Sequence, residues 1–473
     1  MPSRRTFLQQ AGQAAILSSL PAMLQARSPS ESDRMNVLMI ITDDMNDYGF
    51  YNTYPGIHMP HLQAFRRSAL TFRHAYCASP VCGPSRAAVF SGLYPHTTGA
   101  YLNGCDPWGE DSILAQTETL PECLRRNGYY SFGNGKLFHA KMAEGRLGRN
   151  FDNTPFGGGF GPFHPEEDQF IGRFWGFTPW TGPDSDFPDV QNAASSVEFL
   201  RQTHRDPFFL CYGQWRPHTP FTAPKRFFDL YNPDEIPLPP GWQPGDLEDI
   251  PESGHALSRI WGERWDQTGA SNPEQWRKLL HGYAAAHSFA DWTAGQVLDA
   301  LDNSPYADNT IVIFWSDNGY HMGEKDHFEK ATVWEKAALT PFAVRVPGMT
   351  PPGSDSIRPV NTIDIFPTLL DLLGLDPPSH DLEGLSLKPL LQDPAAPWER
   401  PAITTYGEGV FSARDEQYRY IRYPDGAEEL YDHADDPHEF INLANLPEYR
   451  HVKARLGAFY PETWAPSLGG RNG

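Results

Sequence analysis

The sequence predicts an α/β protein with a large mixed, mostly parallel sheet flanked by helices, and a small C-terminal α+β subdomain that contains an antiparallel sheet. Continuous apolar runs alternate with helical patterns up to about residue 400, as in doubly wound sheets. Beyond that point the pattern changes to short, alternating, aromatic segments. The 473 residues suit one large domain, which we place at 35–395, and a smaller unit at 400–473 packed against it.

Three apolar runs are predicted to be buried strands, and each leads into polar residues that can carry chemistry. These are 37–41 with Asp43 and Asp44, 310–316 with Asp317 and Asn318, and 207–213 with Arg216 and His218. A fourth run, 341–346, leads into Pro-Gly and offers no such residue. Because open α/β sheets place their sites at the carboxyl ends of strands, we expect these side chains to converge.

The remaining elements follow from periodicity and composition. Helices are expected at 86–93, 120–127, 190–204, 276–302 and 363–373. In the C-terminal unit we expect one antiparallel strand at 412–423, a second at 428–432 and a helix at 448–459. The region 140–190 is rich in Gly, Pro and aromatic residues, and is predicted to be a long ordered insertion that shapes a pocket.

The net charge of −21 argues against non-specific binding to nucleic acids or to anionic membranes. An anionic substrate would therefore need a local basic pocket, because the overall field of the protein repels it.

The first 30 residues resemble a twin-arginine signal peptide. The segment 3–8 (SRRTFL) is followed by small and apolar residues and by a small-residue site near Ala26. This order favours export over a short amphipathic helix or a disordered leader. The apolar run is too short to span a membrane, and no later segment reaches about 18 apolar residues. We expect a periplasmic or secreted protein without a transmembrane segment in its mature chain, exported by the twin-arginine machinery.

The chain has five cysteines: Cys77, Cys82, Cys105, Cys123 and Cys211. An odd number in an exported protein leaves at least one unpaired. None has the spacing of a zinc site. One cysteine is therefore a candidate for chemistry.

The segment around Cys82, PVCGPSRAAVFSG at 80–92, resembles the signature of type I sulfatases, in which the cysteine of C-x-P-S-R is oxidised to formylglycine. A second signature resembles GYYSFGNGKLFH at 128–139, although Asn134 stands where that family usually has a small or β-branched residue. The resemblance extends from about residue 35 to about residue 431. It is nearest the iduronate-2-sulfatase-like branch, and it implies an alkaline phosphatase-like fold and a formylglycine-generating maturation enzyme as a partner.

Asp43, Asp44, Asp317 and Asn318 offer four oxygen-bearing side chains, a set that suits a hard cation such as Ca²⁺ or Mg²⁺. A solvated pair of acids at a strand end is the alternative for Asp43 and Asp44, but the matching second pair speaks against it. The resemblance implies calcium rather than magnesium, with Cys82 as a further ligand.

Arg86, Lys136 and Lys330 would supply the basic pocket. Arg86 follows the cysteine by one helical turn and can reach back to it, and a helix N-terminus itself favours an anion. The resemblance implies that a hydroxyl of hydrated formylglycine attacks sulfur. It further implies that His218, with Lys330, protonates the leaving sugar oxygen, and that His139 takes the proton whose loss expels sulfate.

Arg216, Asn103, His321 and His327 are predicted to bind substrate, with Trp108 as a further candidate. A surface salt bridge is the alternative for Arg216.

The leading hypothesis is an exported sulfatase that acts on a sulfated carbohydrate, with a 2-O-sulfated uronic acid of a glycosaminoglycan or algal polysaccharide as the candidate substrate. One alternative is a phosphonate monoester hydrolase or phosphodiesterase on the same fold. Another is a non-catalytic carbohydrate-binding relative whose cysteine is never converted. The sequence leaves open the sugar, the sulfated position, exo or endo action, the oligomeric state and the maturation of Cys82.

Overall fold

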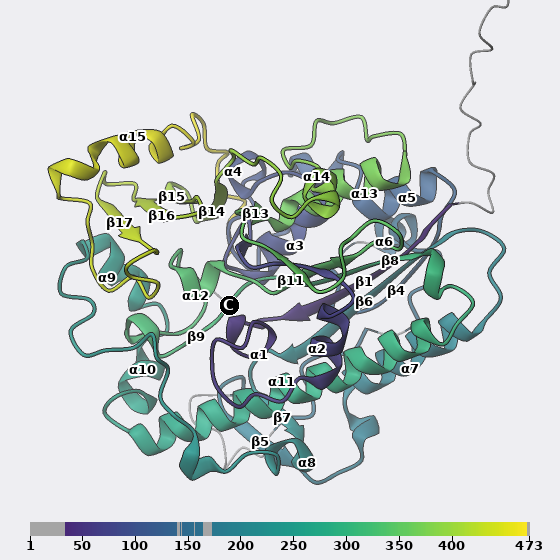
Figure 1. Ribbon diagram of the computed structural model, residues 1–473, viewed down its shortest axis with the longest axis horizontal. Coiled ribbons are helices and arrows are strands. Elements are labelled where there is room, and N and C mark those ends of the chain that lie inside the picture. Colours follow the sequence, from purple (N-terminus) through teal and green to yellow (C-terminus); the bar gives the residue numbers. More distant parts are fainter. Residues whose placement is uncertain (1–33, 140–141, 143, 156, 164–172, 471–473) are drawn as a thin grey trace, which may run out of the picture.

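A seven-stranded sheet crosses the centre of the computed structural model, which describes residues 34–139, 142, 144–155, 157–163 and 173–470 (Figure 1). The signal peptide predicted at 1–30 lies outside these residues. In order across the sheet, the strands are β12 (Ser354–Ser356), β2 (Leu70–Phe72), β11 (Phe342–Arg345), β8 (Thr310–Ser316), β1 (Asn36–Asp43), β6 (Phe208–Pro217) and β4 (Tyr130–Gly135). Only β11 runs antiparallel to its neighbours β8 and β2. The predicted mixed, mostly parallel sheet is confirmed.

The side chains of β1 alternate between two apolar layers, because successive residues of a strand point to opposite faces. Val37, Met39 and Ile41 pack in one layer, and Leu38 and Ile40 in the other. Figure 1 shows helices on both sides of the sheet. The first layer is covered by α3 (Cys82–Ser91), α5 (Leu120–Arg126), α13 (Ile365–Leu373) and α14 (Lys388–Gln392), and the second by α2 (Pro60–Arg66), α7 (Pro188–Arg201) and α11 (Pro273–Asp302).

Helix α3 begins at Cys82, four residues before the start predicted from the apolar pattern. Val81 is extended and its carbonyl accepts a hydrogen bond from Ser85 N at 2.9 Å. Pro84 is tolerated because N–H groups of a first turn have no partner within the helix. The helix ends at Gly92, whose φ of 72° is the left-handed conformation that closes helices. Cys82 therefore lies in the first turn of α3.

The C-terminal unit is an antiparallel sheet of β14 (Ala402–Tyr406), β15 (Val410–Arg414), β16 (Tyr418–Arg422) and β17 (Glu428–Asp432), followed by α15 (Arg450–Gly457). The single strand predicted at 412–423 is wrong, because a turn divides it into β15 and β16. Asp415 Oδ1 accepts from the backbone N of Gln417 at 2.8 Å and of Tyr418 at 2.6 Å, which fixes that turn.

Shorter elements complete the structure. Small paired strands are β3 (Ala75–Tyr76) with β13 (Val360–Asn361), β5 (Phe177–Trp180) with β7 (Phe221–Pro224), and β9 (His321–Met322) with β10 (Phe328–Glu329). The other α-helices are α1 (Asp47–Phe50), α4 (Pro95–Thr98), α6 (Glu144–Asn150), α8 (Lys225–Phe228), α9 (Glu252–Ser258), α10 (Gly262–Thr268) and α12 (Glu335–Ala338). The 3₁₀ turns are η2 (Ile113–Ala115), η4 (Asp184–Asp186), η5 (Pro233–Glu235), η6 (Ala307–Asn309), η7 (Glu324–Asp326), η8 (Thr362–Asp364) and η9 (Pro447–Tyr449). The insertion predicted at 140–190 falls partly outside the described residues; its described parts include α6 and β5.

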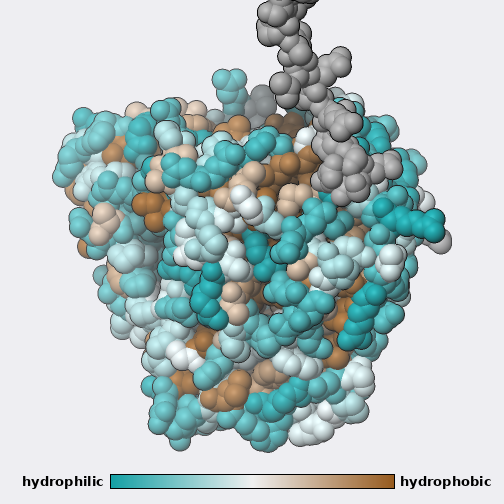
Figure 2. Space-filling model, turned by 45° about the vertical axis from the view of Figure 1, so that its right-hand side comes forward, coloured by the Kyte–Doolittle hydropathy of each residue, from teal (hydrophilic) through white to brown (hydrophobic). Residues whose placement is uncertain are grey.

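Hydrophilic residues predominate on the face shown in Figure 2, and its hydrophobic patches are small and separate. The most exposed large apolar residues, Ile113, Ile357 and Ile441, come from distant parts of the chain. Within the part of the chain that the structure describes, no helix has the length and apolar character needed to cross a bilayer.

Candidate active site

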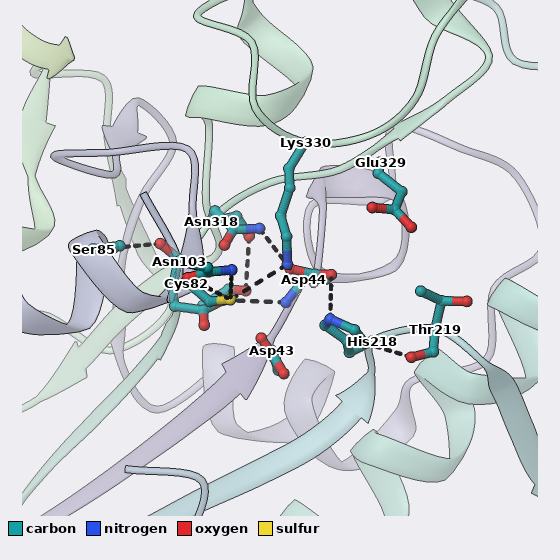
Figure 3. Close-up of polar contacts among 12 residues, drawn as sticks. Asp43, Asp44, Cys82, Ser85, Asn103, His218, Thr219, Asn318, Glu329 and Lys330 are labelled. Carbon is teal, nitrogen blue, oxygen red and sulfur yellow. Dashed lines mark hydrogen bonds and ion pairs between the residues drawn. The ribbon is translucent and has the colours of Figure 1, made fainter. Parts of the chain in front are cut away.

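The two predicted acidic strand ends meet because β1 and β8 are parallel neighbours, with Thr42 opposite Ser316. Asp44 N donates to Asp317 Oδ1 at 3.1 Å, and Asn318 Nδ2 donates to Asp44 Oδ1 at 2.8 Å. The φ of 61° at Asp44 turns the chain sharply after β1. Figure 3 shows Asp43, Asp44 and Asn318 gathered beside the first turn of α3.

Cys82 is fully buried, and polar groups from three other segments surround its sulfur. Its Sγ lies 3.3 Å from His139 Nδ1, 3.4 Å from Asn103 Nδ2 and 3.5 Å from Lys330 Nζ. Asn103 Oδ1 also accepts a hydrogen bond from Gly83 N at 3.0 Å. Burial opposes ionisation of the thiol, but the charges of His139, Lys136 and Lys330 outweigh it, so the pKa of Cys82 lies well below its ordinary value.

Three bases lie against three acids in this site. Arg86 Nε donates to Asp317 Oδ2 at 2.7 Å from one turn beyond the cysteine. The other two contacts are Lys136 Nζ with Asp43 Oδ2 and Lys330 Nζ with Asp44 Oδ1. Three negative and three positive charges cancel, so a divalent cation would leave the site with a net positive charge. This is the local basic pocket that an anionic substrate needs in a protein of net charge −21.

Lys136 reaches Asp43 because β4 and β6 approach closely where β4 ends. Lys136 N donates to Gly213 O at 3.0 Å, and a Cβ on Gly135 would lie 1.8 Å from that oxygen. Gly135 also has a φ of 76°, which side-chain-bearing residues rarely adopt. A glycine is therefore required before Lys136.

The residues present fit a hard cation. Asp43 Oδ1, Asp44 Oδ2 and Asn318 Oδ1 are buried and have no hydrogen-bond partner among the described residues. Buried polar atoms normally have partners, so three unpaired oxygens at one place indicate a missing ligand. Candidate ligand atoms of Asp43, Cys82 and Asp317 lie within 4.8 Å of one another. Carboxylate and amide oxygens are what Ca²⁺ and Mg²⁺ prefer.

His218 follows β6 and lies on the open side of the site. Its Nε2 is 3.5 Å from Asp44 Oδ2, and its Nδ1 contacts Thr219 O. The side chain is 14% exposed, whereas those of Asp44 and Cys82 are fully buried. We call this side, marked by His218 and Thr219 in Figure 3, the open side of the site. Burial, with Lys330 and Lys136 nearby, lowers the pKa of His218 well below its ordinary value despite Asp44.

Other predicted substrate-binding residues are held by the protein itself. Both ring nitrogens of His321 have partners, Glu324 O at 3.1 Å and Thr332 Oγ1 at 2.7 Å. Those of His327 contact Ser258 O at 3.0 Å and Lys330 O at 2.8 Å. These contacts favour structural roles over substrate binding for both histidines.

Arg216 is buried, and it donates to Thr222 O at 2.8 Å and to Phe160 O at 2.7 Å. A surface salt bridge, the alternative considered for it, is excluded by this burial. Burial lowers the pKa of Arg216 to about 10.

Asn103, in contrast to these residues, contacts Cys82 itself. Trp108 packs in the main core against Phe138. Glu329, the residue before Lys330, also lies near Asp44 (Figure 3), and no sequence pattern singles it out.

A groove of about 870 Å³ lies at the other end of β4, beside Tyr129. Four arginines line it, and each contacts an acid or a carbonyl of the protein; Arg149 Nε lies 3.4 Å from Glu122 Oε1. Arg125 contacts Asp152 at 2.5 Å, Arg126 contacts Glu118 at 2.8 Å, and Arg146 donates to the carbonyls of Ala115 and Thr117. Its arginines are thus committed to local structure, which leaves the residues at the carboxyl ends of the strands as the candidate active site.

Comparison with known proteins agrees with this geometry. A family model described as Sulfatase matches residues 35–375, and one described as N-sulphoglucosamine sulphohydrolase, C-terminal, matches residues 323–460. The chain belongs to the sulfatase family. This sulfatase is therefore a sulfuric ester hydrolase. It is 38% identical to a protein named sulfatase from Formosa agariphila, over 92% of this chain and 87% of that protein.

This sulfatase is also 28% identical to human iduronate 2-sulfatase, over 80% of this chain and 76% of that protein.

Two kinds of solved structure share the fold of this sulfatase. A structure in complex with its substrate D-glucosamine-2-N,6-O-disulfate matches with a TM-score of 0.70 at 20% identity, covering 90% of this chain and 97% of that one. The phosphonate monoester hydrolase of Agrobacterium radiobacter matches with the same TM-score and identity, covering 90% and 94%. The fold alone therefore does not separate sulfate from phosphonate esters.

Proposed function

We propose that this sulfatase hydrolyses a sulfate ester of a carbohydrate, using a formylglycine made from Cys82 and a calcium ion held by Asp43, Asp44, Asp317 and Asn318. One observation carries the proposal. The cysteine of the C-x-P-S-R motif lies in the first turn of α3, beside three buried oxygen atoms that lack hydrogen-bond partners. A sulfate ester is an anion and a poor electrophile, so its hydrolysis needs charge neutralisation, a placed nucleophile and an acid for the leaving oxygen.

Two groups would complete the site. A cation held by the acids would act as a Lewis acid toward a sulfate oxygen. Formylglycine at position 82 would supply the nucleophilic hydroxyl when it is hydrated. The contacts around Cys82 support this placement, because Asn103 fixes the side chain from one side and His139 Nδ1 lies within reach of a proton at its end. His139 is thus the proposed base at residue 82.

Three bases are proposed to bind the sulfate group. Arg86, Lys136 and Lys330 already balance the acids, and a divalent cation would free their charge for an anion. Burial disfavours the charged form of Lys330, but Asp44 and Cys82 outweigh it and raise its pKa well above the ordinary value. Lys330 therefore keeps its proton in this structure.

The leaving oxygen belongs on the open side of the site. His218 lies there, 3.5 Å from Asp44, and is the proposed acid for the departing sugar together with Lys330. Because its pKa is lowered in the substrate-free site, His218 must take up a proton when the anionic sulfate ester enters. The geometry supports this role, since an acid must contact the part of the substrate that extends out of the buried pocket.

A sulfated carbohydrate is the proposed substrate class, and a 2-O-sulfated uronic acid is the candidate within it, because a relative is named iduronate 2-sulfatase. Periplasmic or secreted location is proposed from the twin-arginine pattern at residues 3–8. In this proposal a formylglycine-generating enzyme first matures Cys82 in the cytoplasm, and the twin-arginine machinery then exports the folded protein.

A matched pair of esters tests the reaction class. We expect kcat/KM for 4-nitrophenyl sulfate to exceed that for 4-nitrophenyl phenylphosphonate by at least about a hundredfold. Cys82→Ala should abolish both activities, whereas Cys123→Ala, a second buried cysteine, should retain them. A preference for the phosphonate would favour the phosphonate hydrolase alternative. Full activity in Cys82→Ala would overturn the proposed nucleophile.

A further inference from the structure

An ion pair that the sulfate chemistry does not use borders the open side of the site. Glu329 Oε1 pairs with Arg264 Nη1 of α10, and Glu329 directly precedes Lys330. Figure 3 shows Glu329 on the same side of Asp44 as His218 and Thr219, opposite Cys82. The carboxylate is thus close to the proposed leaving group and away from the nucleophile.

The segment that carries Glu329 is conformationally strained. Glu329 has a φ of 80° and Ala331 a φ of 68°, and Lys330 lies between them. Residues with a side chain rarely adopt positive φ, and such residues cluster at functional sites. Glu329 is fixed further by the pairing of β10 with β9, where it lies opposite His321. The strand and the strain together set the direction of this carboxylate.

Arg264 is held between aromatic rings. Its Cζ lies 4.8 Å from the ring centroid of Trp175 and 5.3 Å from that of Trp261, distances at which a cation is attracted to an aromatic face. Its charge is already neutralised by Glu329, so Arg264 is not a fourth base for sulfate. Its role in this geometry is to hold the carboxylate in place.

Buried polar groups next to this pair have no partner. Arg264 Nε, Trp175 Nε1 and Tyr320 Oη are buried without a hydrogen bond to the described residues. Unsatisfied polar groups are uncommon in folded proteins and cost free energy unless a ligand or water meets them. Several of them beside one ion pair indicate a polar ligand.

The exposed fractions of the side chains indicate which part of a bound substrate would lie near Glu329 and Arg264. The side chains of Glu329 and Arg264 are 7% and 14% exposed, and Trp261 is half-buried, whereas Asp44 and Cys82 are fully buried. A sulfate group that enters from the side of His218 keeps its sugar behind it on that side, where Glu329 lies (Figure 3) and where Trp261 lies beside Arg264.

We propose that Glu329, held by Arg264, is a specificity-determining residue that accepts a hydrogen bond from a hydroxyl group next to the sulfate ester on the sugar ring, and that Trp261 packs against that ring. This inference rests on the proposed function. It predicts a sugar with a free hydroxyl beside the sulfate, and it disfavours a second sulfate or a carboxylate at that position, because like charges repel. A uronic acid fits when its carboxylate points away from Glu329.

The test compares two substrates and a charge-balanced variant. Arg264→Met with Glu329→Gln removes both charges and leaves the net charge around the sulfate unchanged. We expect kcat/KM for a 2-O-sulfated uronic acid disaccharide to fall about tenfold to a hundredfold, because the charged acceptor becomes a neutral amide and loses the arginine that holds it in place. Turnover of 4-nitrophenyl sulfate, which has no sugar, should change less than about twofold. Glu263→Gln, an exposed neighbour on α10, should leave both unchanged. Equal losses for the two esters, or no loss for the disaccharide, would overturn the inference.

Binding measured without turnover separates this inference from the proposed function. In the Cys82→Ala background, calorimetry with the disaccharide should show weaker binding for Glu329→Gln by about tenfold. A deoxy disaccharide that lacks the hydroxyl beside the sulfate should bind both proteins equally. If the wild-type enzyme hydrolyses neither ester, the proposed function fails, and this comparison still decides the role of Glu329. Equal disaccharide affinity with and without Glu329→Gln would contradict it.

Discussion

Each base that is proposed to bind sulfate is also the ion-pair partner of an acid in the site. Lys136 contacts Asp43 and Lys330 contacts Asp44 in a region that water does not reach. Removing one member of a buried ion pair leaves a bare charge and typically costs about 3–5 kcal/mol. The bases therefore hold the acids in place in the metal-free protein.

We expect Lys136→Met to lower the free energy of unfolding of the metal-free protein by about 3–5 kcal/mol, because Asp43 loses its ammonium partner. With calcium the loss should be smaller, since the bound cation stabilises the ionised acid in the folded state. Chemical denaturation with a chelator and then with calcium measures both values.

Lys278→Met is the matched control, because Lys278 pairs with Glu274 at the surface of α11. Exposed pairs add little, so neither condition should show a marked change. A loss for Lys136→Met that is the same with and without calcium would count against Asp43 as a ligand.

At the scale of elements, the long helix α11 fixes the turn that carries Asp44. Tyr283 of this helix donates to Asp44 O at 2.7 Å and accepts from Asn46 N at 3.1 Å. Both groups are buried, so the tyrosine hydroxyl satisfies backbone atoms that have no access to water. The helix thereby positions Asp44, one of the proposed metal ligands, from the side of the sheet opposite α3.

Tyr283→Phe should lower the free energy of unfolding by about 1–2 kcal/mol and also weaken calcium binding, because the backbone around Asp44 loses its two hydrogen bonds to the Tyr283 hydroxyl. Calorimetric titration with calcium measures the affinity. Tyr212→Phe removes a similar buried hydroxyl, which bonds Asp189 O at 3.1 Å, and should lower stability without changing calcium affinity. If both variants bind calcium like the wild type, α11 does not position the ligand.

The elements also show what could be predicted from the sequence. The ends of β1 and β8 could be placed together because each is a buried apolar run followed at once by acidic or amide residues, and parallel strands share one carboxyl edge. The start of α3 could not, because the apolar pattern begins only at residue 86, whereas the first turn carries no periodic signal and accepts Pro84. Arg264 and Glu329 lie far apart in the sequence and carry no periodic signal, so only tertiary packing brings them together.

Across the whole molecule, a buried ionic network joins the C-terminal sheet to the catalytic region. Arg419 of β16 contacts Glu335 of α12 and, through Nε, Glu439 Oε1 at 2.6 Å. Burial opposes ionisation of Glu335, but His433, Arg419 and Arg414 outweigh it and hold its pKa well below the ordinary value. For Glu439 burial is likewise outweighed, chiefly by Arg419, and its pKa is also lowered.

Lowered carboxyl pKa values stabilise the folded state above the ordinary pKa of glutamate, about 4.3, and this contribution is lost as the pH falls toward the folded-state values. We therefore expect the free energy of unfolding to fall as the pH drops below about 5. Arg419→Met should lower the free energy of unfolding at neutral pH by about 3–5 kcal/mol, because Glu335 and Glu439 lose their shared partner. It should also flatten the acid limb, which is the part of the plot of unfolding free energy against pH that lies below about pH 5.

Denaturation curves across this pH range measure the effect. Arg358→Met, which breaks the more exposed pair with Glu416, is the control and should leave the acid limb unchanged. An acid limb of the same slope in Arg419→Met would show that other groups dominate the acid sensitivity.

The central claim is that Cys82 is the precursor of the nucleophile, and the mass of the tryptic peptide His74–Arg86 (HAYCASPVCGPSR) from protein made in its native host tests it most directly. We expect residue 82 to have lost its sulfur and gained an aldehyde oxygen, while Cys77 in the same peptide keeps its thiol as an internal control. An intact thiol at Cys82 throughout that sample would contradict the account.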